Sequence, residues 1–452
     1  MWSIDSYKSR PNAQAVAYDD PAALARASER LREMPPLVTS WEVERLREQI
    51  ADAQLGKRFL LQGGDCAETL ADCTRQVITA KLKILLQMSL VLVHASQGPV
   101  IRVGRIAGQY AKPRTEKTEK RDGVELPSFF GDSVNAAEFT PEARRPDPAR
   151  MISAYQHAGL TINFIRSLVA AGFADVTHPE YWDLGFKESV PKEVRAEYEE
   201  KARSLAEALR FMAALGERTF AELARVEFFT SHEALHLDYE AAQTTTVPRR
   251  AGHYLLSTHF PWIGERTRDP NGAHVEFLRG VRNPIGVKLG PSVRESDLLP
   301  LLDALDPKNE PGRITLITRM GAQNVGSGLL PIIESIARAG RRVLWIVDPM
   351  HGNTMKTASG RKTRRFDDIL LEIERTFDVH AAAGTRLGGV HFELTGEDVT
   401  ECIGGAVANV TESDLDDNYA TACDPRLNYR QALEMSFFIA RRLKTLATAG
   451  KP

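Results

Sequence analysis

Eight short apolar runs, separated by longer stretches with helical spacing, constrain the fold of this chain more than any other feature. Most of the runs are continuously apolar rather than alternating, as expected for strands covered on both faces. The runs are Arg58–Gln62, Val100–Arg105, Val226–Thr230, Tyr254–His259, Ile285–Leu289, Ile314–Thr318, Val343–Val347 and Gly389–Glu393. Helical periodicity follows most of them, at 75–97, 148–171, 292–305, 323–339 and 365–379. This alternation predicts an α/β protein whose eight parallel strands close into a (β/α)8 TIM barrel.

The chain is longer than eight βα units require, so we expect additions to the barrel. Residues 1–55, polar and punctuated by proline before a helical stretch, form an N-terminal extension, and residues 56–452 form the barrel. Two insertions are expected after the second strand. The first is a charged loop at about 107–147, and the second is a set of extra helices at about 187–216, rich in Ala, Glu, Leu and Arg.

The composition argues against several classes of protein. The 452 residues carry a net charge of only −2 at pH 7, so nucleic acid is not an expected partner. No segment approaches the ~18 consecutive apolar residues of a membrane span, and the N-terminus lacks a signal-peptide pattern. Four cysteines are too few for a disulfide scaffold in a chain of this length. We therefore expect a cytoplasmic protein that binds neither nucleic acid nor membrane.

Cationic side chains follow the ends of the predicted strands. In a parallel barrel the carboxyl ends of all strands meet at one mouth, where the chemistry of such folds is concentrated. Cations this close repel one another unless an anion neutralises them, and arginine binds phosphate or carboxylate with two parallel hydrogen bonds. Taken alone, each would more often be a surface charge. Together they predict a site for phosphorylated small molecules formed by Arg105, Lys112, Arg114, Arg266, Lys288 and Arg319.

Four residues of different types would meet at the same mouth if the barrel closes. They are Cys66, His351, Glu393 and Asp424. A mixed set of sulfur, nitrogen and oxygen donors suits a divalent transition metal such as Mn²⁺, Co²⁺, Fe²⁺ or Zn²⁺. Their spacing gives little support, and for each residue by itself a structural role is the alternative.

A different metal pattern occurs at the third predicted strand. His232-Glu-Ala-Leu-His236 matches the HExxH motif of zinc proteases. That motif requires a helix and a third ligand, whereas here it directly follows a strand. We therefore do not expect a metalloprotease.

Long motifs at the strand ends, in a fixed order, indicate a family. They run from Pro36-Leu-Val-Thr-Ser-Trp-Glu42 through Leu61-Gln-Gly-Gly-Asp-Cys-Ala-Glu68, Arg105-Ile-Ala-Gly-Gln-Tyr-Ala-Lys-Pro-Arg114, His178-Pro-Glu-Tyr-Trp182, Ser231-His-Glu-Ala-Leu235, Gly280-Val-Arg-Asn-Pro-Ile-Gly-Val-Lys288 and Asp348-Pro-Met-His-Gly-Asn353 to Asn428-Tyr-Arg-Gln-Ala-Leu-Glu434. Together they resemble the class II, plant-like 3-deoxy-D-arabino-heptulosonate 7-phosphate (DAHP) synthases over nearly the whole chain. That family joins phosphoenolpyruvate to erythrose 4-phosphate, the first step of the shikimate pathway to the aromatic amino acids.

The resemblance implies a role for each matching position. It implies that Cys66, His351, Glu393 and Asp424 bind the metal, with Mn²⁺ or Co²⁺ expected first. It implies a sugar-phosphate site at Lys112, Arg114 and Thr115, and a phosphoenolpyruvate pocket at Arg105, Trp262, Glu265, Arg266, Lys288 and Arg319. The proton donor to the nascent alkoxide is either Lys288 or His351, the latter through a metal-bound water.

The resemblance also extends to regulation. The N-terminal extension and the extra helices resemble features of long, feedback-regulated members, which implies a homodimer or homotetramer, an aromatic amino-acid effector and a chorismate mutase partner. Simple packing of surplus helices is the alternative. Because Cys423 adjoins Asp424, we further hypothesise a disulfide between Cys423 and Cys66 when metal is absent.

One segment departs from the family pattern. The family usually has Tyr-Arg-Gly-Asp after Leu-Pro-Ser, whereas this chain has Phe129-Phe130-Gly131-Asp132. The loss of a cation beside the site leaves the aldehyde substrate open. The alternatives are an aminoDAHP or secondary-metabolite variant of the reaction and, in another class, a non-catalytic subunit that binds aromatic ligands. The complete set of metal ligands argues against the last.

Overall fold

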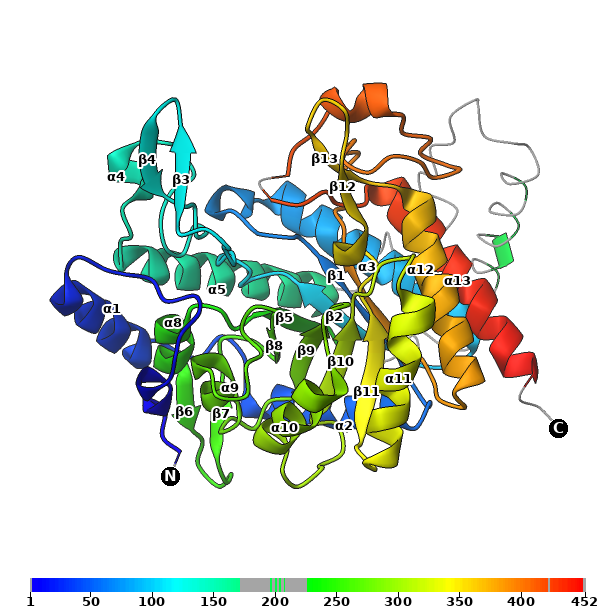
Figure 1. Cartoon of the computed structure of the whole chain (residues 1–452), viewed down its shortest axis with the longest axis horizontal. Helices are drawn as coiled ribbons and strands as arrows, with labels where there is room; N and C mark the ends of the chain where they lie inside the picture. Colours follow the sequence, from blue (N-terminus) through cyan, green and yellow to red (C-terminus); the bar gives the residue numbers. More distant parts are fainter. Residues whose placement is uncertain are drawn as a thin grey trace.

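A closed barrel of eight parallel strands is the centre of the chain (Figure 1). The computed structural model describes residues 2–170, 196, 200, 203, 204, 207, 226–421 and 423–449. Around the barrel the strands follow the order β1-β14-β11-β10-β9-β8-β5-β2, so each βα unit lies beside the next along the chain. The predicted (β/α)8 architecture is confirmed by the strands β1 Phe59–Gly64, β2 Val100–Arg105, β5 Phe229–Glu233, β8 Phe260–Ile263, β9 Ile285–Leu289, β10 Ile314–Thr318, β11 Val343–Val347 and β14 Gly389–Glu393.

The fourth strand is not where the sequence predicts it. Tyr254–His259 was expected to be the barrel strand, but His253–Leu255 form β7, which pairs antiparallel with β6 (Thr244–Thr246) outside the barrel. The barrel strand is β8, where Phe260 and Trp262 pair with Ser231 and Glu233 of β5. The apolar run continues through both segments, so periodicity alone does not locate the strand. The third strand likewise lies three residues later than predicted.

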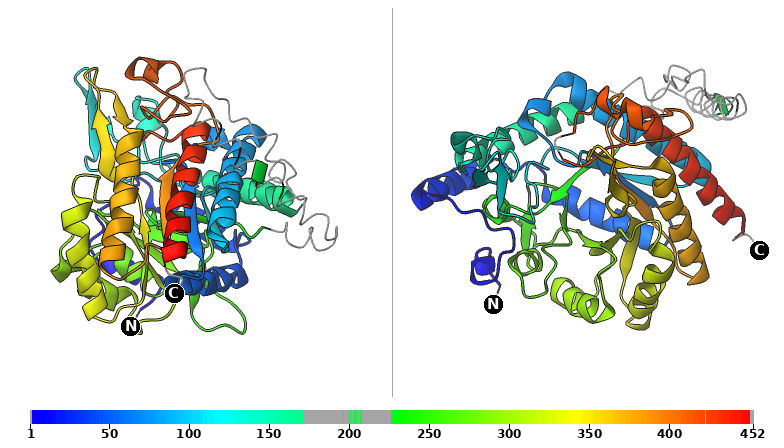
Figure 2. Two further views of the ribbon diagram at one scale, coloured as in Figure 1. Left: turned by 90° about the vertical axis from the view of Figure 1, so that its right-hand side faces the viewer. Right: turned by 45° about the horizontal axis from the view of Figure 1, so that its top comes forward.

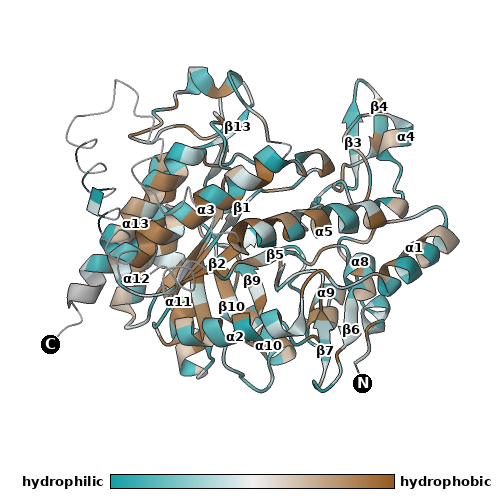
Figure 3. Cartoon of the chain, turned by 180° about the vertical axis from the view of Figure 1, so that it is seen from behind, coloured by the Kyte–Doolittle hydropathy of each residue, from teal (hydrophilic) through white to brown (hydrophobic). Residues whose placement is uncertain are grey.

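The helices pack around the outside of the barrel (Figure 2), and most of them combine apolar and polar residues along their length (Figure 3). In α11 the apolar residues recur at helical spacing, and Leu329, Ile332, Ile333 and Ile336 are buried. Each predicted helix is present within three residues at either end. The covering helices are α3 Arg75–Ser96, α5 Ala149–Ala170, α9 Ala273–Leu278, α10 Glu295–Leu305, α11 Val325–Arg338, α12 Phe366–Ala382 and α13 Tyr429–Ala449.

The helix α3 is both long and apolar. In the described part of the chain it alone is long and apolar enough to cross a membrane, judged by length and composition. In this fold it packs along α13 and β2, and 61% of its apolar window is buried. We therefore interpret α3 as a core helix of the barrel.

The N-terminal segment contributes two helices, α1 (Pro21–Glu33) and α2 (Ser40–Gln54). Thr39 and Glu42 form a reciprocal capping box that fixes the start of α2. Leu46 and Ile50 of α2 pack against Leu60 at the amino-terminal end of the barrel. This helix closes the end of the barrel opposite to the strand carboxyl ends, while the predicted domain boundary at residue 55 stays a prediction.

Two small hairpins rise on the same side of the barrel (Figure 1). The first consists of β3 (Thr118–Arg121) and β4 (Val124–Pro127), so the loop predicted at 107–147 contains a hairpin and the short helix α4 (Pro141–Arg144). The second consists of β12 (Thr354–Lys356) and β13 (Lys362–Arg364). The extra helices predicted near 187–216 fall outside the described residues, except for five scattered positions.

Candidate active site

A cavity of about 740 Å³ opens at the carboxyl ends of the strands. It is lined by residues from β1, β2, β5, β8, β9, β10, β11 and β14 or from the loops that follow them. Every site residue predicted from the sequence contributes to its wall: Cys66, Arg105, Lys112, Arg114, Thr115, Trp262, Glu265, Arg266, Lys288, Arg319, His351, Glu393 and Asp424. Residues up to 358 positions apart in sequence are thus brought together by closure of the barrel.

The turn after β1 directs Cys66 into this cavity. Gly64 has φ +145°, and a Cβ there would lie 2.3 Å from the carbonyl oxygen of Arg105. Only glycine therefore allows β1 and β2 to approach so closely at their ends. Arg105 Nη2 then donates to the Cys66 carbonyl at 3.0 Å, which ties the two loops together.

Arg105 is buried beside other site residues rather than extended into solvent. Its Nη1 donates to His391 Nε2 at 2.8 Å, and its Nη2 lies 3.2 Å from Glu393 Oε1. Burial, followed by the repulsion of Lys288 and Arg105, holds the pKa of His391 well below its usual value, so its ring is neutral and accepts this hydrogen bond. The guanidinium also lies 5.1 Å from the centre of the Trp262 ring. These contacts fix one cation at the floor of the cavity.

A second pair of charges lies at the rim of the barrel. Arg319 Nη1 donates to Glu265 Oε2 at 2.6 Å, and Arg319 Nη2 donates to the His351 carbonyl at 3.3 Å. A Cβ at Gly290, just after β9, would lie 2.1 Å from Glu265 Oε2, so a larger residue there would displace this carboxylate. Glu265 thus orients Arg319, as a carboxylate orients a guanidinium through charge-assisted hydrogen bonds.

The hairpin of β3 and β4, inserted after β2, contributes a carboxylate, Glu119, to the cavity wall. Glu119 of β3 forms ion pairs with Arg114, Arg121 and Arg144. In contrast, Lys112 and Arg266 have no carboxylate within ion-pair distance in the described part of the chain, and Arg266 Nε donates only to Thr115 Oγ1 at 3.2 Å. Lys112 and Arg266, which have no carboxylate partner among the described residues, thus line a cavity that already contains several other cations. This side of the cavity therefore favours an anionic ligand.

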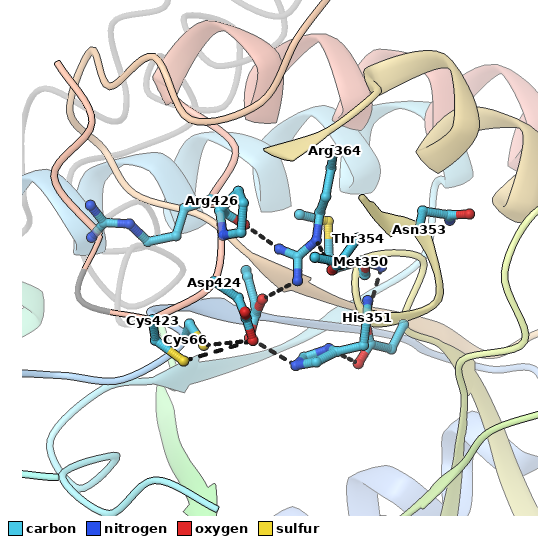
Figure 4. Close-up of polar contacts among 12 residues, drawn as sticks. Cys66, Met350, His351, Asn353, Thr354, Arg364, Cys423, Asp424 and Arg426 are labelled. Carbon is cyan, nitrogen blue, oxygen red and sulfur yellow. Dashed lines mark hydrogen bonds and ion pairs between the residues drawn. The ribbon is translucent and has the colours of Figure 1, made fainter. Parts of the chain in front are cut away.

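The predicted metal donors belong to two groups that share Asp424, and Cys66, Cys423, Asp424 and His351 are labelled in Figure 4. Donor atoms of Cys66, Cys423 and Asp424 lie within 4.8 Å of one another, and so do those of His351, Glu393 and Asp424. The Sγ atoms of Cys66 and Cys423 each lie 3.7 Å from Asp424 Oδ2, and His351 Nε2 lies 3.0 Å from Glu393 Oε1. Asp424 belongs to both sets and joins them.

The Glu393 carboxylate is the strongest sign that this group fits a cation. Both of its oxygens are fully buried and accept no hydrogen bond, although Arg105, Arg364 and His351 lie within ion-pair distance. Buried polar atoms without a hydrogen bond are rare and require an explanation such as an ion. Burial alone would raise the pKa of Glu393, but His351 and Arg364 outweigh it and hold the pKa well below its ordinary value. The ionised carboxylate is therefore ready to bind a cation.

His351 is oriented for the same purpose by Asp348. His351 Nδ1 and Lys288 Nζ both lie 2.7 Å from Asp348 Oδ2. Burial would raise the pKa of Asp348, but His351 and Lys288 hold it well below its ordinary value, so this carboxylate is ionised. A hydrogen bond from Nδ1 to a carboxylate leaves the Nε2 lone pair available, as in most metal-binding histidines.

Several residues in or beside the cavity were not predicted as catalytic, substrate-binding or metal-binding residues, although Cys423 was predicted to pair with Cys66. Asp348 follows β11 directly and was quoted only as part of a motif. Glu233 and Cys423 line the cavity, together with Lys362, which donates to Asp424 Oδ1 at 2.9 Å. Burial, only partly offset by Lys288 and Arg105, raises the pKa of Glu233. Asp348 and Glu233 could have been predicted, because they lie at the carboxyl ends of barrel strands. Lys362 lies on the β12–β13 hairpin, for which the sequence contained no comparable signal.

The HExxH motif has a structural role. His232 lies in β5, where its Nε2 contacts Glu240 Oε1 of α8 (Leu237–Ala242) at 2.7 Å. His236 Nε2 contacts the Tyr18 hydroxyl at 3.0 Å. The two histidines are thus held by different partners, and among the described residues they do not form a metal-donor group.

The Phe129-Phe130 segment lies against the hairpin that carries Glu119. The Phe130 carbonyl accepts a hydrogen bond from the Lys112 amide at 2.8 Å, and the buried Arg144 guanidinium lies 5.9 Å from the centre of the Phe129 ring. Arg144 also donates to three carbonyl oxygens of the same loop, those of Pro127, Ala137 and Glu138. The loop backbone that positions Lys112 is therefore ordered with phenylalanine at both positions.

The fold and the cavity together define a (β/α)8-barrel protein with a cationic mouth and a mixed sulfur, nitrogen and oxygen donor group. A profile described as "Class-II DAHP synthetase family" matches residues 2–440. The chain therefore belongs to the class-II DAHP synthetase family, as the strand-end motifs predicted.

Curated relatives agree along nearly their whole length. Phospho-2-dehydro-3-deoxyheptonate aldolase of Neurospora crassa is 47% identical over 97% of this chain and 94% of its own length. The protein of the same name from Streptomyces coelicolor is 48% identical, over 96% of each chain. Phospho-2-dehydro-3-deoxyheptonate aldolase AroG of Mycolicibacterium smegmatis is 44% identical over 98% of this chain and 94% of its own. A solved structure of the phospho-2-dehydro-3-deoxyheptonate aldolase from Francisella tularensis is 14% identical, with a TM-score of 0.44, over 92% of this chain and 96% of its own.

Proposed function

We propose that this chain condenses phosphoenolpyruvate with erythrose 4-phosphate to give DAHP and inorganic phosphate, the first step of the shikimate pathway. The observation that carries the proposal is one cavity whose wall contains seven lysine and arginine side chains, including the six predicted from the sequence, together with the metal-donor group. The reaction brings two phosphorylated anions together, and their repulsion is opposed most effectively by fixed cations in a partly buried site.

The cations divide into two proposed subsites. Arg105, Arg266, Lys288 and Arg319, with Trp262 and Glu265, bind phosphoenolpyruvate. Lys112, Arg114 and Thr115 bind the phosphate of the aldehyde substrate. The supporting observation is that Lys112 and Arg266, one in each proposed subsite, line the cavity and have no carboxylate partner within the described ranges. A substrate phosphate that reaches Arg114 must compete with Glu119 for its guanidinium.

Cys66, His351, Glu393 and Asp424 would hold a divalent cation in this proposal, with Mn²⁺ or Co²⁺ as the first expectation and Fe²⁺ or Zn²⁺ as alternatives. A metal bound there would supply Lewis-acid polarisation of the aldehyde carbonyl. The donor set mixes a thiolate with imidazole and carboxylate, which suits borderline transition metals more than Mg²⁺ or Ca²⁺.

Lys288 is the proton donor in our proposal. When carbon 3 of phosphoenolpyruvate attacks the aldehyde, the aldehyde oxygen gains a proton, and water adds at carbon 2 before phosphate leaves. Lys288 Nζ lies in the cavity wall, and burial, followed by Arg105, lowers its pKa, which favours proton transfer. His351 is the less suitable donor because its Nδ1 proton is engaged by Asp348.

The two cysteines of the donor group lead to a testable consequence. A hydrogen bond to Cys423, followed by burial, raises the pKa of Cys66, and the same bond lowers the pKa of Cys423. Without metal, air oxidation is expected to join the two sulfurs, with dioxygen accepting two electrons and two protons. The metal-free, oxidised protein should then show two titratable thiols in denaturant, from Cys73 and Cys402. Four thiols would contradict this expectation.

The identity of the aldehyde is tested by a direct comparison. We expect kcat/KM for erythrose 4-phosphate to exceed that for its imino analogue by at least about tenfold, which corresponds to about 1.4 kcal/mol. Product formation from phosphoenolpyruvate and each aldehyde, at saturating Mn²⁺, measures the ratio. A reversed ratio would indicate an aminoDAHP synthase and would assign the Phe129-Phe130 departure to substrate choice.

Regulation and assembly stay predictions. They comprise a cytoplasmic homodimer or homotetramer, inhibition by an aromatic amino acid, and a chorismate mutase partner. The N-terminal helices α1 and α2 are the described elements on which these predictions depend.

A further inference from the structure

A buried network of charged side chains lies behind the metal-donor group and does not line the cavity. Asp65, Lys81, Glu401 and Arg426 are each at most 7% exposed. Arg426 donates from Nη1 to Asp65 Oδ1 at 2.7 Å, and from Nη2 and Nε to the two Glu401 oxygens at 2.8 and 3.1 Å. Lys81 of α3 forms an ion pair with the second Asp65 oxygen. Two cations and two carboxylates thus balance one another.

This network joins the two loops that carry the sulfur and carboxylate donors. Asp65 directly precedes Cys66 in the loop after β1, and Arg426 follows Asp424 by two residues in the last loop before α13. Although 361 positions separate Asp65 and Arg426 in sequence, their side chains are in direct contact. The Arg426 amide also donates to Glu401 Oε2 at 2.7 Å, so the backbone of the last loop is held by the same carboxylate.

The network consists of buried ion pairs. Asp65 lies between Lys81 and Arg426, and Arg426 binds both oxygens of Glu401. Buried ion pairs cost desolvation free energy, and apolar residues of similar volume often give equal or greater stability. Stability is therefore a poor explanation for four charges at this place. A geometric role explains them better, because a guanidinium fixes the direction of each carboxylate that it binds.

We propose that Arg426 is a positioning residue, which fixes the spacing between Cys66 and Asp424 by binding Asp65 and Glu401. Arg426 is not itself a ligand, because it is cationic and its guanidinium points away from the donor group (Figure 4). The inference rests on the proposed metal site and adds the device that assembles it. The spacing of the donors is then set before any cation binds.

The test uses two conservative variants of the full chain, Arg426→Lys and Asp65→Asn. Lysine keeps the charge but cannot bind two carboxylates in the fixed geometry of a guanidinium, and asparagine keeps the shape but not the charge. We expect the dissociation constant for Mn²⁺, measured by equilibrium dialysis, to rise about 10–100-fold, the range found when outer partners of metal ligands are changed. With Co²⁺, the near-ultraviolet thiolate-to-metal charge-transfer band should weaken or shift.

Arg47→Lys provides the matched control. Arg47 is also a buried arginine with a carboxylate partner, Glu310, but it lies in α2 at the opposite end of the barrel. This variant should bind Mn²⁺ like the wild type, even if its melting temperature falls as far as that of Arg426→Lys. If all three variants weaken binding equally, general destabilisation explains the effect and the positioning role is overturned.

The remaining outcomes separate this inference from the proposed function. Wild-type Mn²⁺ affinity and an unchanged Co²⁺ spectrum in both Arg426→Lys and Asp65→Asn would overturn the positioning role and leave the metal site intact. No Mn²⁺ binding by the wild type would overturn both proposals. If Arg426→Lys does not fold, the Mn²⁺ affinity and the Co²⁺ spectrum of Asp65→Asn alone test the positioning role.

Discussion

Replacement of Cys66 by serine is expected to abolish metal-dependent turnover. The thiolate is the only soft donor among Cys66, His351, Glu393 and Asp424, and a serine hydroxyl stays protonated at neutral pH and binds transition metals weakly. We expect the Mn²⁺ dissociation constant to rise by more than about 100-fold, beyond the range typical of outer partners. Turnover at fixed Mn²⁺ and the metal affinity itself, measured separately, check the prediction.

The control for this variant is Cys73→Ser. Cys73 is also partly buried, but its Sγ contacts the His157 carbonyl and the Thr161 hydroxyl and lies outside the cavity wall. That variant should keep wild-type metal affinity and turnover. Activity of Cys66→Ser equal to that of Cys73→Ser would remove Cys66 from the metal site.

Lys288→Gln is expected to lower kcat by about 10²–10⁴-fold, the contribution typical of a positioned general acid. Glutamine can still donate a hydrogen bond to Asp348, but it has no proton to transfer to the substrate oxygen. The KM for phosphoenolpyruvate should also rise, because one of the cations of its pocket is lost. Mn²⁺ affinity should change only a few-fold, since Lys288 is not a donor in the proposed site.

The two candidate proton donors are distinguished by the division between kcat and KM. A higher KM for phosphoenolpyruvate with unchanged kcat in Lys288→Gln would show that Lys288 only binds substrate. The proton donor would then be His351, acting through a metal-bound water. Lys356→Gln is a suitable control, because Lys356 is exposed on β12 and does not line the cavity. Its steady-state constants should match those of the wild type.

The barrel could be predicted because its strands are buried on both faces and therefore form continuous apolar runs. The same property caused the error at the fourth strand. From Tyr254 to Ile263 the chain is almost uninterrupted by charge, so the residues that pair with β5 cannot be recognised from hydropathy. Register is decided by neighbouring strands, which a single sequence does not reveal.

Candidate site residues could be predicted from the sequence where they lie at the carboxyl ends of barrel strands. Arg105 ends β2, Lys288 is the last residue but one of β9, and Arg319 follows β10, and the closed barrel brings strand ends together. The contributions of Glu119 and Arg426 could not be predicted in this way. Each acts through ion pairs with residues distant in sequence, so its role exists only once the loops are folded against one another.

The departure at Phe129-Phe130 has a physical interpretation. The Phe130 carbonyl accepts a hydrogen bond from the Lys112 amide, and Arg144 beside Phe129 is buried and bound to loop carbonyl oxygens. Lys112, Arg114 and Arg266 are the cations that line the cavity on this side, and Arg114 is shared with Glu119.

The central claim is that one cavity performs a metal-dependent condensation of two phosphorylated substrates. The most direct measurement is release of inorganic phosphate from phosphoenolpyruvate in the presence of erythrose 4-phosphate, with protein that has been stripped of metal and then reconstituted with Mn²⁺. We predict stoichiometric phosphate release that requires both the aldehyde and the metal. Release that is unaffected by metal removal, or no release with any aldehyde at saturating Mn²⁺, would contradict the account.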